Sequence, residues 1–188
     1  MRPVIKMEKQ DTRYIFAQSI KDLMNHQALD KITVTDIVKN SGMTRQTFYR
    51  YFKDKYDLVN WYFERLADQS FLQIGAQETL LQGLTKKFEF ILHDQVFFSE
   101  AFKSKDYNNV ENYDYNCIYN FYTNVIKKKI QGDVPEDIDF LLRMYCHGSI
   151  TMTVEWAVNG MKRTPADMAS LLIEALPDKL EYYLKDLK

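Results

Sequence analysis

Apolar residues recur with the spacing of an α-helix along most of this chain, and few residues interrupt the pattern. The 188 residues include only six glycines and four prolines. Because folds of short strands need many turns rich in Gly and Pro, this scarcity favours an all-α fold. With 46% hydrophobic and 27% charged residues, the chain can bury a core and lacks the composition of a disordered protein.

Charge is distributed unevenly along the chain. Residues 1–60 contain 11 Lys and Arg against seven Asp and Glu, whereas residues 61–188 contain 14 against 19. A basic end on an acidic body favours a polyanionic partner for the basic end. The N-terminus has no apolar core of the signal-peptide kind, and no segment approaches the ~20 apolar residues of a membrane helix. We therefore expect a cytoplasmic protein without membrane contact.

The first 60 residues predict a longer first helix and two short helices joined by a sharp turn. Thr33 and Asp36 have the spacing of a capping box at the start of the second helix. Gly42 can take the left-handed conformation that ends this helix, and Thr44 caps a third helix. This is the arrangement of a helix-turn-helix motif. Its expected core consists of Phe16, Ile20, Leu23, Ile37, Val38, Met43, Phe48, Phe52 and Leu58.

The third helix carries the residues that could read DNA. Phe48 and Phe52 face the core, which leaves a polar and basic face exposed. Arg45 can form two hydrogen bonds with guanine and Gln46 two with adenine, and both lie at the end of the helix that such motifs insert into the major groove. Lys55, at the start of the next helix, suits a phosphate. The alternative is an ordinary amphipathic helix, but the turn, the caps and the exposed Arg and Gln favour DNA binding.

The rest of the chain predicts a helical body. Its apolar stripes mark helices over about residues 80–92, 110–131, 136–159 and 165–186. Pro165 follows a capping Thr164 at the start of the last helix, and Pro177 is expected to bend it. A helix over about 55–73 is the covalent bridge between head and body, and we expect Trp61 to be among the residues that enter the body.

The run IVKNSGMTRQTFYRYFKDKYDL, from Ile37 to Leu58, strongly resembles the DNA-binding signature of the TetR family. The likeness covers about residues 12–63. It implies an all-α protein with an N-terminal three-helix helix-turn-helix head, a C-terminal helical bundle and a homodimer formed through the last two long helices. We accordingly expect a DNA-binding domain over residues 1–55 and a sensing and dimerisation domain over 56–188.

The resemblance also implies a transcriptional regulator that binds double-stranded palindromic operator DNA. By motif position, Arg45 and Gln46 would lie at the bases, with hydroxyls and Lys55 near phosphates. The expected DNA-binding residues are Thr35, Thr44, Arg45, Gln46, Thr47, Tyr49, Arg50, Tyr51 and Lys55. Many family members have Gly where this chain has Gln46, so their base preference cannot be transferred.

Two modes of sensing stay open for the body. The run Arg45 to Tyr49, followed by Trp61 to Glu64, resembles a branch of activators of dihydroxyacetone kinase operons, which sense a kinase-like protein. The effector is therefore either a small molecule or such a protein co-regulator. The expected effector-binding residues are Tyr122, Met144, His147, Met152 and Trp156. The expected dimer-interface residues are Met152, Trp156, Met168, Leu172 and Leu176. Stripes of Met and aromatic residues also occur in plain cores.

Enzymatic chemistry finds no support in the sequence. The chain has no phosphate-binding loop, no G-x-S-x-G and no H-E-x-x-H. Cys146 and His147 are adjacent, and on a helix they would point about 100° apart. The three histidines are not at metal-ligand spacing. The sequence therefore predicts no catalytic residues, no cofactor and no metal site.

Overall fold

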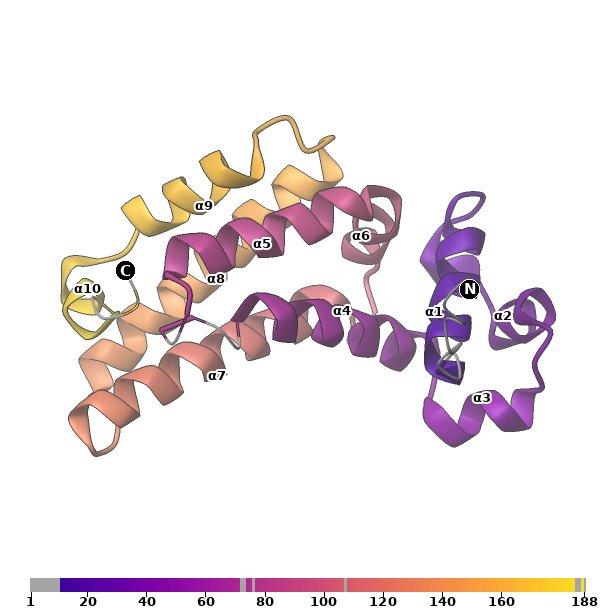
Figure 1. Cartoon of the computed structure of the whole chain (residues 1–188), viewed down its shortest axis with the longest axis horizontal. Coiled ribbons are helices and arrows are strands. Elements are labelled where there is room, and N and C mark those ends of the chain that lie inside the picture. Colours follow the sequence, from indigo (N-terminus) through magenta and orange to yellow (C-terminus); the bar gives the residue numbers. More distant parts are fainter. Residues whose placement is uncertain (1–10, 72–73, 76, 107, 185–186, 188) are drawn as a thin grey trace, which may run out of the picture.

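The computed structural model describes residues 11–71, 74–75, 77–106, 108–184 and 187. The N-terminal head contains three helices and a short 3-10 turn, and a fourth helix leads into the body (Figure 1). These elements are α1 (Thr12–Met24), η1 (Leu29–Lys31), α2 (Val34–Ser41), α3 (Arg45–Tyr51) and α4 (Lys55–Phe71). Among the described residues, the only β pairing is an isolated bridge between Ile74 and Glu78, so the predicted all-α class is confirmed.

Local hydrogen bonds explain where the head helices begin and end. The Thr33 hydroxyl accepts from the Asp36 amide at 3.2 Å, and the Asp36 carboxylate accepts from the Thr33 amide at 2.9 Å. This capping box starts α2, as predicted. Gly42 ends it with a φ of 68°, which an L side chain adopts only at a cost. Thr44 caps α3, and the turn between the two helices is therefore encoded locally.

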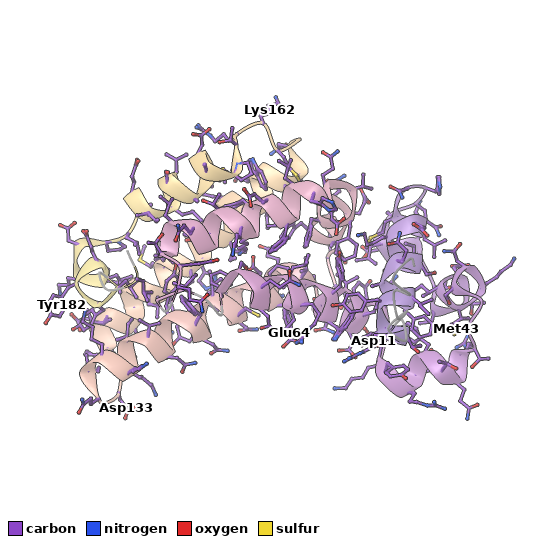
Figure 2. All side chains as sticks on the ribbon, viewed as in Figure 1. Asp11, Met43, Glu64, Asp133, Lys162 and Tyr182 are labelled. Carbon is purple, nitrogen blue, oxygen red and sulfur yellow. The ribbon has the colours of Figure 1, made fainter. Side chains whose placement is uncertain are left out.

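The head has its own core of aromatic and aliphatic residues. Phe16 and Phe48 are fully buried, with ring centroids 5.2 Å apart and an edge-to-face geometry. Phe52 adds a third ring, 5.7 Å from Phe48. All nine residues of the predicted head core are buried or packed against it, Leu23 and Met43 being the two that are only partly buried. In Figure 2 the labelled Met43 lies in the head, far from the body.

The body contains six helices among the described residues. They are α5 (Leu80–His93), α6 (Gln95–Lys103), α7 (Val110–Ile130), α8 (Glu136–Val158), α9 (Pro165–Glu174) and α10 (Asp178–Leu184). Helix α5 packs against α9, while α7 and α6 pack against α8. The helix predicted over 165–186 is divided at Pro177 into α9 and α10. Helix α6 was not predicted, because its apolar run follows α5 after a single residue.

Helix α4 contacts the head with one face and the body with another. Trp61 packs against Tyr14 of α1 and Phe52 after α3, with centroid separations of 5.0 and 5.7 Å. The expectation that Trp61 enters the body is therefore wrong, because this face of α4 completes the head core. Phe63 does face the body and lies 6.2 Å from Phe98 of α6.

Candidate nucleic-acid interface and effector region

The outer face of α3 is polar and exposed because its inner face carries the head core. Phe48 and the following Phe52 are buried, whereas Arg45, Gln46 and Arg50 are exposed. Tyr49 is also largely exposed, at 49%. The head thus presents a row of Arg, Gln and Tyr side chains on a helix too short to be stable without its packed face.

The guanidinium of Arg45 is held at this surface by two neighbours. Its Nη1 donates to the Thr35 hydroxyl of α2 at 2.8 Å, and its Nη2 donates to the Tyr49 hydroxyl at 3.4 Å. The guanidinium carbon lies 5.7 Å from the centre of the Tyr49 ring. Since a guanidinium has five N–H donors, these contacts restrain the side chain and leave donors for a base.

The other expected DNA-binding residues surround Arg45 on the head. The hydroxyls of Thr44 and Thr47 lie 2.9 Å apart, and Thr44 also accepts from the Thr47 amide as the cap of α3. Thr35, Thr44 and Tyr51 are exposed, and Thr47 is half-buried. The structure therefore brings eight of the nine expected residues to α2, α3 and the cap between them.

The ammonium group of Lys55 is hydrogen-bonded within the head and has a structural role. Its Nζ donates to the backbone carbonyls of Leu29, Asp30 and Ile32 at 2.8, 2.9 and 2.8 Å. Burial lowers the pKa of Lys55, while the Asp30 carboxylate opposes that shift. All three N–H donors are occupied by the link between α1 and α2. The phosphate contact expected of Lys55 stays a prediction that this geometry disfavours.

The five expected effector residues do not meet in one place. Tyr122 is buried in the body and packs edge-on against Tyr145, while Met144 and His147 are exposed on the opposite face of α8. His147 stacks on Tyr115 at 4.2 Å. Met152 and Trp156 instead line a surface groove, so the set divides among three environments.

A groove between α8 and α9 contains most of the expected dimer-interface residues. It has a volume of about 540 Å³, and its apolar wall includes Met152, Trp156, Met168, Leu171 and Leu172. Its rim carries polar and charged groups, and the labelled Lys162 marks it on the α8–α9 turn in Figure 2.

The five expected dimer-interface residues differ in how far they are exposed on the protomer surface. Trp156, Met168, Leu172 and Leu176 are buried within the protomer, whereas Met152 is exposed. Sequence reasoning missed the exposed Phe140 and Leu171, although Phe140 and Met144 recur on the face of α8 opposite its buried stripe.

The body core is centred on a buried ion pair and leaves little free space. The Nζ of Lys87 on α5 donates to both carboxylate oxygens of Asp114 on α7, at 2.7 and 2.6 Å. Asp114 is fully buried, and burial raises its pKa although Lys87 acts in the opposite direction. Two cavities next to Lys87 hold about 10 Å³ each, roughly the space of one water.

No three His, Cys, Asp or Glu residues in the described part of the chain are arranged to hold a metal ion. No helix there is both long and apolar enough to cross a bilayer.

Comparison with known families agrees with this geometry. Residues 19–60 match the bacterial regulatory proteins of the tetR family, and residues 78–178 match a transcriptional regulator C-terminal region of the same family. The chain therefore belongs to the TetR family of transcriptional regulators.

One characterised activator is similar to part of the chain. The chain is 34% identical over 95 residues to the HTH-type dhaKLM operon transcriptional activator DhaS of Lactococcus lactis subsp. lactis (strain IL1403). The match spans 48% of this chain and 49% of that relative, about half the length of each.

Solved structures share the fold over almost the whole chain. A dihydroxyacetone kinase operon activator DhaS has a TM-score of 0.65 at 22% identity, covering 95% of this chain and 98% of that one. A TetR regulator from Streptococcus agalactiae 2603V has a TM-score of 0.62 at 22% identity, covering 95% and 94%. FadR from Bacillus subtilis in complex with stearoyl-CoA has a TM-score of 0.60 at 16% identity, covering 93% and 99%. These identities show a common fold and nothing finer.

Lys55→Met tests the role of the Lys55 ammonium. Removing three charge-assisted hydrogen bonds should lower the free energy of unfolding by about 2 kcal/mol. The slope of log affinity against log salt should not change, because no phosphate contact is lost. Arg50→Met, on the exposed face of α3, should leave the free energy of unfolding unchanged and reduce that slope by about 1. A reduced salt slope in Lys55→Met at unchanged stability would restore Lys55 to the phosphate contacts.

Proposed function

We propose that this TetR-family regulator binds a palindromic operator as a homodimer, with one α3 from each protomer in the major groove. The observation that carries the proposal is the exposed Arg45 and Gln46 face of α3, fixed from behind by buried Phe48. Two such heads related by two-fold symmetry read half-sites about one turn of DNA apart, ~34–36 Å, or a multiple of it. The excess of basic residues in the first 60 supplies the phosphate attraction.

Selection from random duplex DNA tests the DNA-binding proposal. We expect a palindromic consensus and binding that weakens steeply with salt. Arg45→Ala should cost about 1–3 kcal/mol and relax the preference at one base pair of each half-site. Arg50→Met is the matched control on the same helix, since loss of a phosphate contact weakens all sequences alike. Selection that yields no consensus for the unaltered protein would remove the proposal.

The dimer interface proposed here is the exposed face of α8 and α9. Phe140, Met144 and Met152 on α8 and Leu171 on α9 are large apolar side chains that the protomer leaves exposed. Exposed apolar side chains on adjacent helices are typical of a subunit interface. Gly148 lies on the exposed face of α8, where an added Cβ would meet nothing within 4 Å, so a partner helix can approach closely.

Leu171→Asp tests this interface. A charge in an apolar seam has no partner there, so we expect the dimer to dissociate in sedimentation experiments and operator affinity to fall. Leu81→Asp is a close control, because Leu81 on α5 is also 42% exposed but lies outside α8 and α9. It should stay dimeric. If both variants remain dimeric at micromolar concentration, the interface lies elsewhere.

The α8–α9 groove supports a small-molecule effector. Its volume of about 540 Å³ is within the range of ligand sites, and its apolar wall carries a charged rim. FadR of Bacillus subtilis, which shares the fold, was solved in complex with stearoyl-CoA.

The second candidate is a protein co-regulator, such as a dihydroxyacetone kinase-like subunit. The filled core around Lys87 favours it, as does the similarity to activators of dihydroxyacetone kinase operons.

Ala175→Trp distinguishes the two modes by filling the groove from the end of α9, at a residue outside the proposed dimer face. A small-molecule effector at 100 times its dissociation constant stabilises the protein by about 2.7 kcal/mol. Ala175→Trp should abolish that stabilisation and the accompanying change in operator affinity, whereas Leu81→Trp, on α5 and outside both the groove and the proposed dimer face, should preserve both. The protein co-regulator would be favoured if a kinase-like subunit changed operator affinity without any small molecule. Its effect should then be equal in both variants.

A further inference from the structure

Helix α6 is attached to the DNA-binding head at both of its ends. It begins after Asp94 and ends before Ser104, and the side chains of both cap residues bind residues of the head. Figure 1 shows α6 at the end of the body that faces α1, against which it packs. Within the body it packs mainly against α8.

The first joint is an ion pair at the start of α6. Asp94 accepts from the Lys21 ammonium of α1 at 2.7 Å and from the Tyr62 hydroxyl of α4 at 2.6 Å. Lys21 also donates to the Tyr62 hydroxyl at 3.2 Å, which closes a triangle. His93, at 3.3 Å from Asp94, is the other ionisable group at this carboxylate.

Asp94 does not use its carboxylate as a helix cap. The Asp94 side chain is only 9% exposed and makes no capping hydrogen bond with α6. Burial alone raises the pKa of Asp94, but the hydrogen bonds from Lys21 and Tyr62 outweigh it and hold the pKa below its usual value. The carboxylate therefore stays charged and serves the contact with the head.

The second joint lies at the end of α6. The buried Ser104 hydroxyl donates to the Asp30 carboxylate of η1 at 2.6 Å. The Tyr56 hydroxyl of α4 donates to the same oxygen at 3.1 Å. Lys55 holds the backbone carbonyl of Asp30, so η1, α4 and the end of α6 meet at one place.

Two joints at the ends of a nine-residue helix restrain the head more than either joint alone. The helix is about 13 Å long, so the joints act at well-separated points. The head already packs against α4 through Trp61, and attachment at two further points restrains its orientation relative to the body further. Since α6 packs against α8, the orientation of the head is tied to the helix that carries the proposed dimer face.

We propose that Asp94 and Ser104, which lie in the body, are positioning residues for DNA binding. They fix the orientation of the head and thereby the separation of the two α3 helices in the dimer. This inference rests on the proposed binding of a palindromic operator by a homodimer. Loss of either joint should widen the range of separations that the dimer can adopt, so that the dimer discriminates less between operator spacings.

Operators with altered spacing test the inference on the full-length protein. One base pair inserted between the half-sites moves them by about 3.4 Å and rotates them by about 35°. The ratio of affinities for the selected operator and the altered one measures how firmly the heads are held. Asp94→Ala and Ser104→Ala should lower that ratio about tenfold, equivalent to about 1.4 kcal/mol, mostly by weakening binding to the selected operator. Binding to a single half-site should not change.

Lys103→Met is the matched control on the same helix. It breaks the ion pair with Glu100, which joins two residues of α6, and should leave the spacing ratio unchanged. A variant that only loses stability weakens binding to all spacings alike, so the ratio separates positioning from folding. Ser104→Ala removes a single hydroxyl and keeps the test valid if Asp94→Ala does not fold. The inference would be overturned if Ser104→Ala, and Asp94→Ala where it folds, kept the spacing ratio of the unaltered protein. If the unaltered protein bound no palindrome, the proposed function itself would be overturned.

Discussion

The packing of Phe48 against Phe16 is the constraint on which the DNA-binding surface depends. Helix α3 has seven residues, and isolated helices of that length are not stable in water. Its helical form is held by the burial of Phe48 and by the caps at its two ends. Once Phe48 points inward, the helical period of about 100° per residue places Gln46 and Arg50 on the opposite side of α3. The same burial thus stabilises the helix and selects the residues that it presents.

Two lysines, the partly buried Lys55 and the buried Lys87, fix separate segments of the chain through their ammonium groups. Lys55 satisfies its three donors with backbone carbonyls of the α1–α2 link, whereas Lys87 binds a single buried carboxylate, Asp114. A desolvated charge without partners costs several kcal/mol, so each lysine fixes the segment that supplies its acceptors. For Lys87 this fixes α5 against α7 in the middle of the body. A ligand that bound between α5 and α7 would have to separate Lys87 from Asp114. A ligand in the α8–α9 groove would not break this ion pair.

The sequence predicts the parts of this structure that depend on neighbouring residues. The capping box of Thr33, the left-handed Gly42 and the caps at Thr44 and Thr164 are all local hydrogen-bond or backbone effects, and all are confirmed. Helix α6 was missed because only Asp94 separates it from α5, so no breaker marked its start. The roles of Lys55 and Trp61 depend on which distant segment packs beside them, and no local pattern reports that. The exposed apolar face of α8 could have been recognised, since Phe140 and Met144 interrupt its polar side.

The polar character of the joints between α6 and the head suits a surface whose orientation must respond to a signal. Coupling between an effector and DNA is typically worth 1–3 kcal/mol, and it must come from contacts that differ between two states. A head docked through a large apolar interface would require much more than that to reorient. A hydrogen bond between neutral groups contributes about 0.5–1.5 kcal/mol and one with a charged group somewhat more, so the contacts of Asp94 and Ser104 are of the same order as the coupling energy. Contacts of this strength are sufficient to bias the orientation of the head, and they are weak enough for a coupling energy of that size to break them.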